Sequence, residues 1–310
     1  MKCFERKDTK TQSCKENLKL CVLAILRPLR LLIISCFVLS ACVEDIILPI
    51  QNGPKLLVVE GSLTTDTMAH QIKLSLSSDF YNQEPPVPVT GAIVTITEGS
   101  NVWTLTEIPN TGIYKTASDF FAVPYKTYRL DITNVDIADG AEHYWAESSC
   151  YPINPMDSIQ ITEHFRNDKD RLTIYIFMKD DGDIENFYMG TFSVNDKLMT
   201  DSINQYFFMD DAFFNGNYID GRFPIFSIYK KGTVDNEKAL QNGDKVTVHA
   251  YGIPKDYYYF IGDLRSAGSS NPFMGPPANP RTNIYPKGKA CGYFYVASVQ
   301  HQSRIYYAEE

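Results

Sequence analysis

Apolar and polar residues alternate with a period of two in a series of short segments between Leu56 and Ser148. In the segment 71–77, Ile72, Leu74 and Leu76 share one face, and polar residues occupy the other. Turn residues separate these segments, and such alternation is typical of half-buried strands. Six or seven strands in 95 residues, with no helical period, predict a Greek-key β-sandwich over 55–149.

A second series of apolar segments follows residue 156. Residues 150–156 contain Pro152 and Pro155, which interrupt both helices and sheet ladders, so we expect a linker there. Residues 172–178 are largely apolar on both faces, which favours a central strand. Residues 290–299 predict a closing strand that returns to the sheet.

The segment 254–267 changes to a helical period. Tyr257, Phe260, Ile261 and Leu264 fall at i, i+3, i+4 and i+7, and Pro254 suits the start of a helix. We therefore predict a mainly β fold. An N-terminal Greek-key β-sandwich is followed by a second β-rich domain, residues 157–310, that carries one helix.

The first 41 residues have the pattern of an export signal. Eight Lys and Arg residues against three Asp and Glu precede an apolar run at 31–39, which ends in Leu-Ser-Ala-Cys at 39–42. Nine apolar residues are too few for a transmembrane helix, which needs about 20. The alternative, an uncleaved anchor over 18–43, would place Arg27 and Arg30 inside the bilayer.

The tetrapeptide at 39–42 resembles the lipobox of bacterial lipoproteins. The resemblance implies that a signal peptide, residues 1–41, is removed and that Cys42 receives acyl chains, which together anchor a protein firmly. An ordinary secretory signal with a coincidental cysteine is the alternative. Residues 42–54 would then form a polar tether. Glu44 and Asp45 resemble the surface-export signal of Bacteroidota lipoproteins, and the choice between the cell surface and the periplasmic face of the outer membrane stays open.

Removal of residues 1–41 changes the charge balance. It leaves 21 Lys and Arg against 34 Asp and Glu, a net charge of −13. Binding to nucleic acid is driven by the release of counterions from basic patches, and no such patch is present in the sequence. We therefore expect no nucleic-acid partner and a membrane contact through the lipid anchor alone.

Cys150 and Cys291 are the two cysteines that follow Cys42. In an oxidising compartment they can form a disulfide, and two buried free thiols are the alternative. The segment 269–288 carries five prolines. A loop of this length is either functional or a covering strap, and the strap, pinned by Phe273 and Met274, is the favoured interpretation.

Recognisable catalytic chemistry is scarce. The five histidines are scattered without an HExxH spacing, and no G-x-S-x-G, P-loop or G-x-G-x-x-G motif occurs. We expect no catalytic residue and no cofactor. Oxygen ligands for Ca²⁺ could come from Asp180, Asp181, Asp183 and Glu185, but the spacing is not that of an EF-hand, so a solvated hairpin turn is preferred.

Tyrosine is concentrated in the C-terminal part. Interfaces favour tyrosine because it combines apolar area with a hydroxyl group at low entropic cost. We consider Tyr257, Tyr258, Tyr259 and Tyr285 as a partner surface, with core packing as the alternative. Consecutive tyrosines on a helix cannot all face one core.

Several short motifs together resemble one family. They lie at 57–61, 88–96, 112–114, 125–130, 153–159, 182–188, 211–216 and 292–294. The chain resembles Bacteroidota outer-membrane lipoproteins that carry a domain of unknown function, with an immunoglobulin-like or transthyretin-like N-terminal sandwich. A departure is Tyr125, which stands where a glycine usually precedes the Lys-Thr-Tyr strand.

The resemblance also suggests a function. Members of the family resemble accessory lipoproteins of TonB-dependent outer-membrane receptors, so we expect a lipid-anchored envelope protein that binds a partner or ligand for such a receptor. A structural or adhesive surface lipoprotein is the second hypothesis, and a hydrolase with paired carboxylates is the third.

Overall fold

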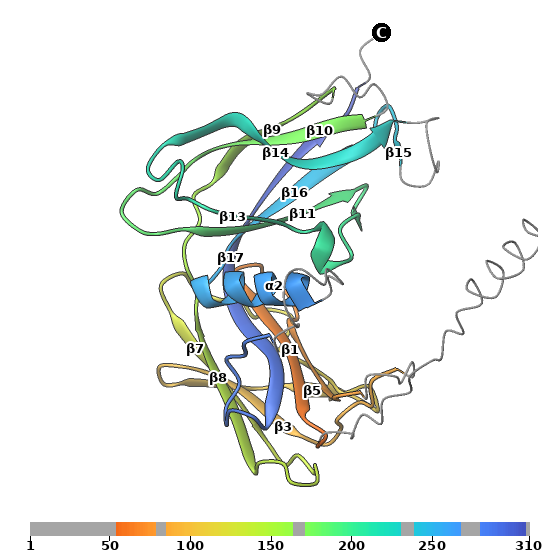
Figure 1. Ribbon diagram of the computed structural model, residues 1–310, viewed down its shortest axis with the longest axis vertical. Coiled ribbons are helices and arrows are strands. Elements are labelled where there is room, and N and C mark those ends of the chain that lie inside the picture. Colours follow the sequence, from red (N-terminus) through yellow and green to blue (C-terminus); the bar gives the residue numbers. More distant parts are fainter. Residues whose placement is uncertain (1–53, 79–84, 164–170, 231–238, 268–279, 308–310) are drawn as a thin grey trace, which may run out of the picture. The chain divides into compact units, whose positions relative to one another are not determined.

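The computed structural model describes residues 54–78, 85–163, 171–230, 239–267 and 280–307 (Figure 1). Residues 1–53, which include the predicted signal peptide, Cys42 and most of the predicted tether, lie outside this part of the chain. Within it, strands predominate, and α2 (Lys255–Ala267) is the one α-helix. The prediction of a mainly β fold with a single helix is therefore confirmed.

The N-terminal strands form two sheets around one core. One sheet contains β1 (Leu57–Thr64), β2 (Gln71–Leu76), β6 (Ile113–Lys115) and β5 (Thr106–Ile108); the other contains β4 (Asn101–Thr104), β3 (Ile93–Glu98), β7 (Thr127–Thr133) and β8 (His143–Ser149). Leu74 from the first sheet and Ile132 from the second belong to the same buried cluster. In β7 every second residue is buried, as the period of two predicts.

The C-terminal strands surround a second core. One sheet contains β15 (Ala239–Leu240), β14 (Tyr218–Lys230), β10 (Arg171–Lys179) and β9 (Met156–Glu163). Facing it are β12 (Lys197–Leu198), β11 (Phe187–Val194), β13 (Phe207–Asp210) and β16 (Lys245–Gly252), which belong to the larger sheet. Ile174 of β10 and Val248 of β16 are both fully or almost fully buried in this core.

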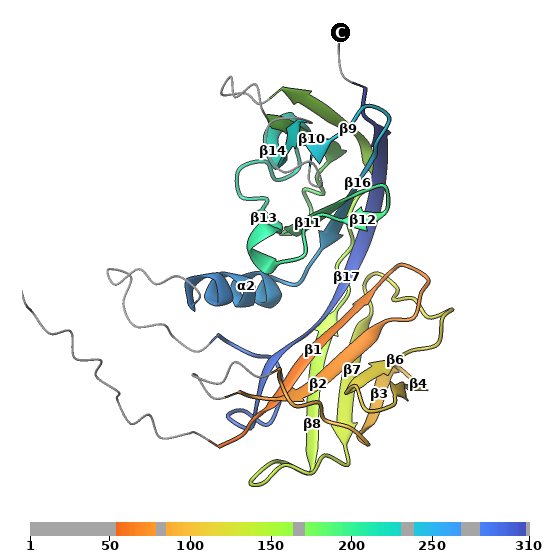
Figure 2. The same ribbon diagram turned by 90° about the vertical axis from the view of Figure 1, so that its right-hand side faces the viewer.

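The last strand, β17 (Ala290–Ile305), joins the two groups of strands (Figure 2). Its first half pairs in parallel with β1, and its second half pairs antiparallel with β16. The result is one nine-stranded sheet that includes strands of both groups. The sequence predicts a closing strand over 290–299, and the observed strand runs six residues further, because polar residues such as Gln300 and Gln302 continue the ladder with β16.

Gly292 of β17 lies directly opposite Val59 of β1. Its φ of 86° lies in the left-handed region, which side chains other than glycine rarely adopt. A Cβ added there would lie 2.1 Å from the carbonyl oxygen of Val59, an atom of the neighbouring backbone. The parallel pairing of β1 and β17 therefore depends on a glycine at this position.

We expect Gly292→Ala to lower the free energy of unfolding by about 2 kcal/mol or more, because both the backbone strain and the clash with β1 oppose it. Gly262→Ala is the matched control, since Gly262 lies in α2 and an added Cβ meets no atom within 4 Å. That change should leave stability unchanged or raise it by up to about 1 kcal/mol. Urea unfolding measures both; equal stability of the two variants would contradict the account of β17.

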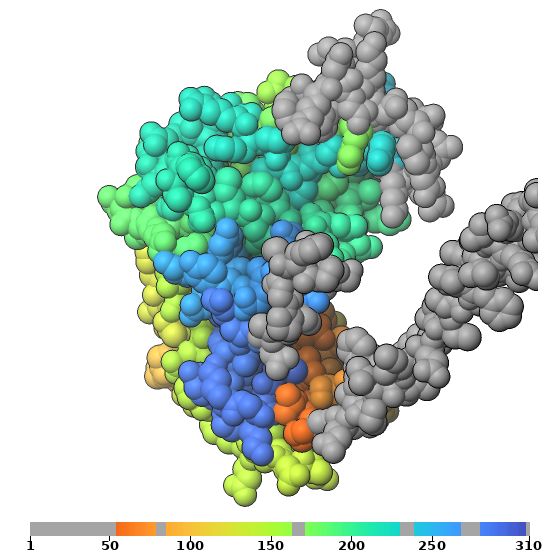
Figure 3. Space-filling view, viewed as in Figure 1, coloured from red at the N-terminus to blue at the C-terminus, as the bar shows by residue number. Residues whose placement is uncertain are grey.

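Helix α2 packs on the large sheet through the face that the sequence predicts. Tyr257, Phe260 and Ile261 are buried and lie in one cluster with Phe187 of β11 and Tyr293 of β17. Figure 3 shows the outer surface of the helix on this side of the molecule. Helix packing here depends on the strand that joins the two groups, since Tyr293 belongs to β17.

The described end of the proline-rich segment covers the N-terminal sandwich. Ile284 is fully buried in the sandwich core, and Asn283 exchanges hydrogen bonds with the backbone of Phe294, donating over 2.7 Å and accepting over 3.1 Å. Residues 280–288 therefore act as a strap. The expected pinning residues Phe273 and Met274 lie outside the described residues.

Tyr125 has a φ of 66°, in the left-handed region. Tyr125 therefore adopts the left-handed conformation that the family's usual glycine would allow at this turn. The backbone N–H of Tyr125 donates to the carbonyl of Cys150 over 2.7 Å, which holds the turn.

Candidate functional site

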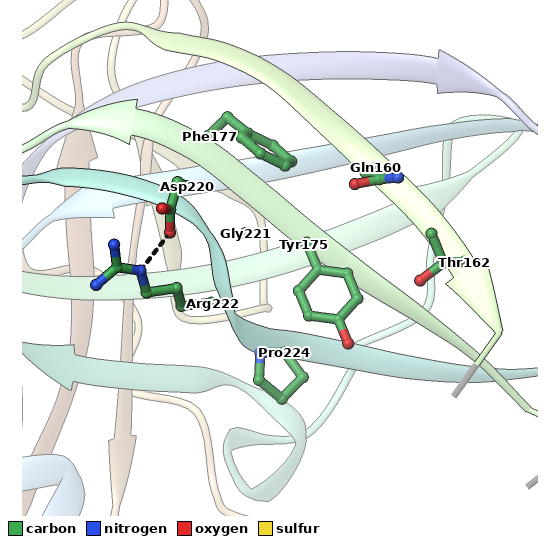
Figure 4. Close-up of a pocket in the computed structure, with 8 residues that line it drawn as sticks. All are labelled: Gln160, Thr162, Tyr175, Phe177, Asp220, Gly221, Arg222 and Pro224. Carbon is green, nitrogen blue, oxygen red and sulfur yellow. Dashed lines mark ion pairs between the residues drawn. The ribbon is translucent and has the colours of Figure 1, made fainter. Parts of the chain in front are cut away.

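The outward face of the β9–β10–β14 sheet carries a depression. Along β10, Ile174, Ile176 and Met178 point into the core, which leaves Tyr175 and Phe177 on the other face. The depression has a volume of about 480 Å³ and is lined by Gln160, Thr162, Tyr175, Phe177, Asp220, Gly221, Arg222 and Pro224 (Figure 4).

An irregularity in β14 shapes this pocket. Tyr175 pairs with Pro224 and Phe177 pairs with Asp220, so β14 has three residues between these partners where β10 has one. Gly221 lies in this bulge with a φ of 75°, and an added Cβ would be 2.6 Å from Cζ of Phe177. The bulge lets the aromatic ring lie directly against the backbone of β14.

The pocket combines aromatic faces with exposed polar groups. Asp220 and Arg222 form an ion pair of 2.8 Å at its rim, while Gln160 lies on the opposite side, on β9 (Figure 4). The eight lining residues include neither His nor Cys. This arrangement can hold a ligand by contact with the two rings and by hydrogen bonds, but it offers no paired nucleophile and base.

A second feature of the chain, an exposed loop, lies directly before β14. The segment 211–217, which we call the Phe213 loop, connects β13 to β14 and exposes 93% of the Phe213 side chain. Phe214, by contrast, is buried and is in ring contact with Tyr188. One aromatic residue thus anchors the loop, and its neighbour is presented to solvent.

The buried carboxylate of Asp180 braces the Phe213 loop. Its two oxygens accept hydrogen bonds from the Tyr188 hydroxyl, at 2.5 Å, and from the backbone N–H of Gly216, at 2.7 Å. Asp211 braces the other end, because its Oδ2 accepts the backbone N–H of Asn186 over 2.7 Å. The loop is held at both ends by buried, charge-assisted hydrogen bonds.

Burial governs the ionisation of Asp180 and Tyr188. Loss of solvent raises the pKa of the Asp180 carboxyl, while the hydrogen bonds from Tyr188 and Gly216 oppose that rise. Burial also raises the pKa of the Tyr188 phenol, and the neighbouring carboxylate of Asp180 raises it further. Tyr188 therefore stays protonated and continues to donate to Asp180 at neutral pH.

The acidic turn does not form a metal site among the described residues. Asp181 accepts the backbone N–H of Asp183, and Glu185 pairs with Lys255 over 2.8 Å, so these carboxylates serve different partners. No group of three or more His, Cys, Asp or Glu residues that could hold a metal ion occurs in the described part of the chain. The preferred interpretation, a solvated turn, is wrong for Asp180, which is 1% exposed.

The four candidate tyrosines do not form one surface. Tyr257 is buried and stacks on Tyr295 with ring centroids 3.8 Å apart, so the prediction of a partner surface is wrong for it. Tyr258 is half-buried, and Tyr259 is exposed beside Arg281. Tyr285 belongs to the strap and stacks on Trp145 of β8. Helical geometry separates the three consecutive side chains.

Cys150 and Cys291 are free thiols. The Sγ of Cys150 lies 3.4 Å from Oγ of Ser298, which is seven residues along β17 from Cys291. Seven residues of extended strand span about 23 Å, whereas a disulfide needs Cα atoms within about 7 Å. The disulfide alternative is therefore wrong, and burial raises the pKa of both thiols.

Sequence reasoning selected the acidic turn but not the Phe213 loop or the bulge of β14. The signal for the loop was present as two motifs, 182–188 and 211–216, which are adjacent in the structure through Asn186 and Asp211. Nothing in one sequence indicated that they pair. The predicted lipidation site, Cys42, lies outside the described residues.

We expect Asp180→Ala to lower the free energy of unfolding by about 2 to 4 kcal/mol, because the buried Tyr188 hydroxyl and the Gly216 N–H both lose their acceptor. Asp183→Ala, at an exposed position of the same turn, should change it by less than about 0.5 kcal/mol. Denaturant unfolding with intrinsic tyrosine fluorescence measures both. A small effect of Asp180→Ala would show that the brace contributes little.

Comparison with known proteins identifies the family. Residues 43–303 match the family described as a domain of unknown function (DUF4249), which covers most of the chain. A search of curated proteins found no match. Within the described residues no helix has both the length and the apolar character needed to cross a bilayer. The chain belongs to this family.

Proposed function

We propose that this member of the DUF4249 family is a lipid-anchored envelope protein of a Bacteroidota bacterium that docks onto a TonB-dependent outer-membrane receptor. The leader pattern and Cys42 support the anchor. The family match begins at Val43, the residue after this cysteine, so the shared domain starts where the lipidated form would start. The absence of any basic patch in the sequence favours a protein partner over nucleic acid.

One observation carries the docking proposal: Phe213 is 93% exposed on a loop that buried hydrogen bonds hold in place. An exposed phenylalanine contributes nothing to the stability of the free protein. On a rigid loop it loses little entropy on binding and can fill a pocket of a partner, as residues that dominate interface energies do. The site therefore supports binding better than catalysis.

The pocket of Figure 4 lies on β9, β10 and β14, of which β14 directly follows this loop in sequence, and it adds a second contact region. Asp220 is three residues from Asn217, the last residue of the Phe213 loop. A partner that covers Phe213 can therefore extend over β14. Aromatic and arginine residues such as Tyr175 and Arg222 are common in the energetically important part of interfaces.

The docking proposal is tested by pull-down from detergent-solubilised outer membranes of the native host. We expect the unmodified protein to retain an outer-membrane barrel receptor, and Phe213→Ala to weaken that interaction by about 30-fold, as loss of roughly 2 kcal/mol implies. Tyr307→Ala removes another exposed aromatic side chain and should have no effect. Equal retention by both variants would refute docking through Phe213.

The anchor is tested separately with Cys42→Ser. Because acyl chains on this residue supply the membrane affinity, the variant should leave the envelope fraction and appear as a soluble exported protein. Fractionation with mass spectrometry of the N-terminal peptide measures the change. A variant that stays in the envelope, or a native protein with an unmodified thiol, would contradict the anchor. If a variant of the protein reduced cell adhesion but left receptor binding intact, the structural or adhesive hypothesis would be favoured instead.

A further inference from the structure

Four polar side chains from separate segments form a continuous chain beside a second pocket. Asp66, in the loop between β1 and β2, contacts Nε2 of His301 at 2.9 and 3.0 Å. Nδ1 of His301 lies 2.7 Å from Nδ1 of His249, and Nε2 of His249 lies 3.1 Å from Oγ of Ser193. His249 and His301 are direct cross-strand partners on β16 and β17.

These contacts define the tautomers. A carboxylate only accepts, so Nε2 of His301 carries a hydrogen that it donates to Asp66, and in the neutral form of the ring Nδ1 has a free lone pair. His249 then donates its Nδ1 hydrogen to His301, and its Nε2 accepts the hydroxyl of Ser193. Both Nε2 atoms are held by outer partners, and both Nδ1 atoms point at the same position.

This is the arrangement in which proteins prepare histidines for a metal ion. A ligating imidazole uses one nitrogen for the metal while the other is oriented by a carboxylate, a hydroxyl or a carbonyl. Metal–nitrogen bonds of about 2.0 to 2.1 Å place two ligating nitrogens about 2.9 to 3.4 Å apart, depending on the coordination angle. The observed 2.7 Å would have to open by only a few tenths of an ångström.

The surroundings suit a cation. The pair lines a pocket of about 270 Å³ together with Asp66, Thr191, Tyr206 and Tyr251, which leaves room for water ligands. Burial lowers the pKa of His249 and the neighbouring His301 lowers it further, which favours the neutral ring. The negative charges of Asp66 and Asp196 oppose that shift, and they also attract a cation to the pair.

We propose that His249 and His301 bind one divalent transition-metal ion of the Zn²⁺ or Cu²⁺ class through their Nδ1 atoms, with Asp66 and Ser193 as orienting residues. The Nδ1 hydrogen of His249 leaves the shared position and reappears on Nε2, from which it is donated to Ser193. The hydroxyl of Ser193 can make this exchange because it both donates and accepts. No proton is released at neutral pH, and water supplies the remaining ligands.

The two imidazoles are the only protein nitrogens assigned to the ion. No group of three or more His, Cys, Asp or Glu that could hold a metal ion occurs among the described residues, so the proposal rests on the geometry of this pair alone. The sequence alone did not indicate this site, because His249 and His301 are 52 residues apart. Neither ring has a nitrogen left to serve as a general base, because all four are occupied, so the arrangement favours metal binding over acid–base catalysis.

The test is a titration of the purified protein, made without a polyhistidine tag, with Zn²⁺ at pH 7.5. We expect one saturable Zn²⁺ per chain, no such binding in His249→Gln or His301→Gln, and affinity about 10-fold to 100-fold lower in Asp66→Asn. His143→Gln is the matched control, since His143 is an exposed histidine that also contacts an aspartate, Asp131. It should bind Zn²⁺ as the unmodified protein does.

Histidine side-chain nitrogen spectra give a second readout, which reports coordination itself and not affinity. Zn²⁺ should shift the Nδ1 signals of two imidazoles, which disappear from the spectrum of the corresponding variants, and acidification to pH 5.5 should reverse the shift. Absence of saturable binding, equal affinity in His249→Gln, or coordination at other histidines would overturn the proposal.

Discussion

The pairing of β17 with two different strands is the constraint on which the structure depends. Its first half adds to β1 of the sandwich and its second half adds to β16, so one continuous backbone is shared by two cores. Gly292 permits the first contact, and Val248 and Ala250 on β16 belong to the core beside the second. The strap, the position of α2 and the Asp66–His301 contact all follow from this strand.

Local pattern was sufficient to predict the helix and many of the strands, although not β9, β12 or β15. The alternation at Ile72 and Leu74 identified the buried face of β2, and the period of Tyr257, Phe260 and Ile261 identified that of α2. Each of these signals lies within a few residues. Their physical basis is burial of one face, which the sequence of a single element expresses.

Contacts between distant segments could not be predicted in this way. The parallel pairing of β1 with β17 joins residues more than 230 positions apart, and the sequence contains no signal for the partner of either strand. The Phe213 loop illustrates the same limit at the candidate site: Asp180 was recognised as part of an acidic turn, but its buried role depends on Gly216 and Tyr188. His249 and His301 belong to no sequence motif, and only the register of β16 and β17 brings them together.

The shared strand also connects the parts of the functional account. The braced loop that presents Phe213 belongs to the C-terminal strands, whereas β1 belongs to the sandwich. The two are connected through β17, which pairs with β1 and β16, and through the linker that follows β8. Native-state hydrogen exchange of the β17 amides tests this most directly. If β17 is one shared unit, the amides of residues 290–297 and of residues 298–305 should exchange with one common free energy of opening. Early exchange of residues 298–305 while residues 290–297 stay protected would contradict this account.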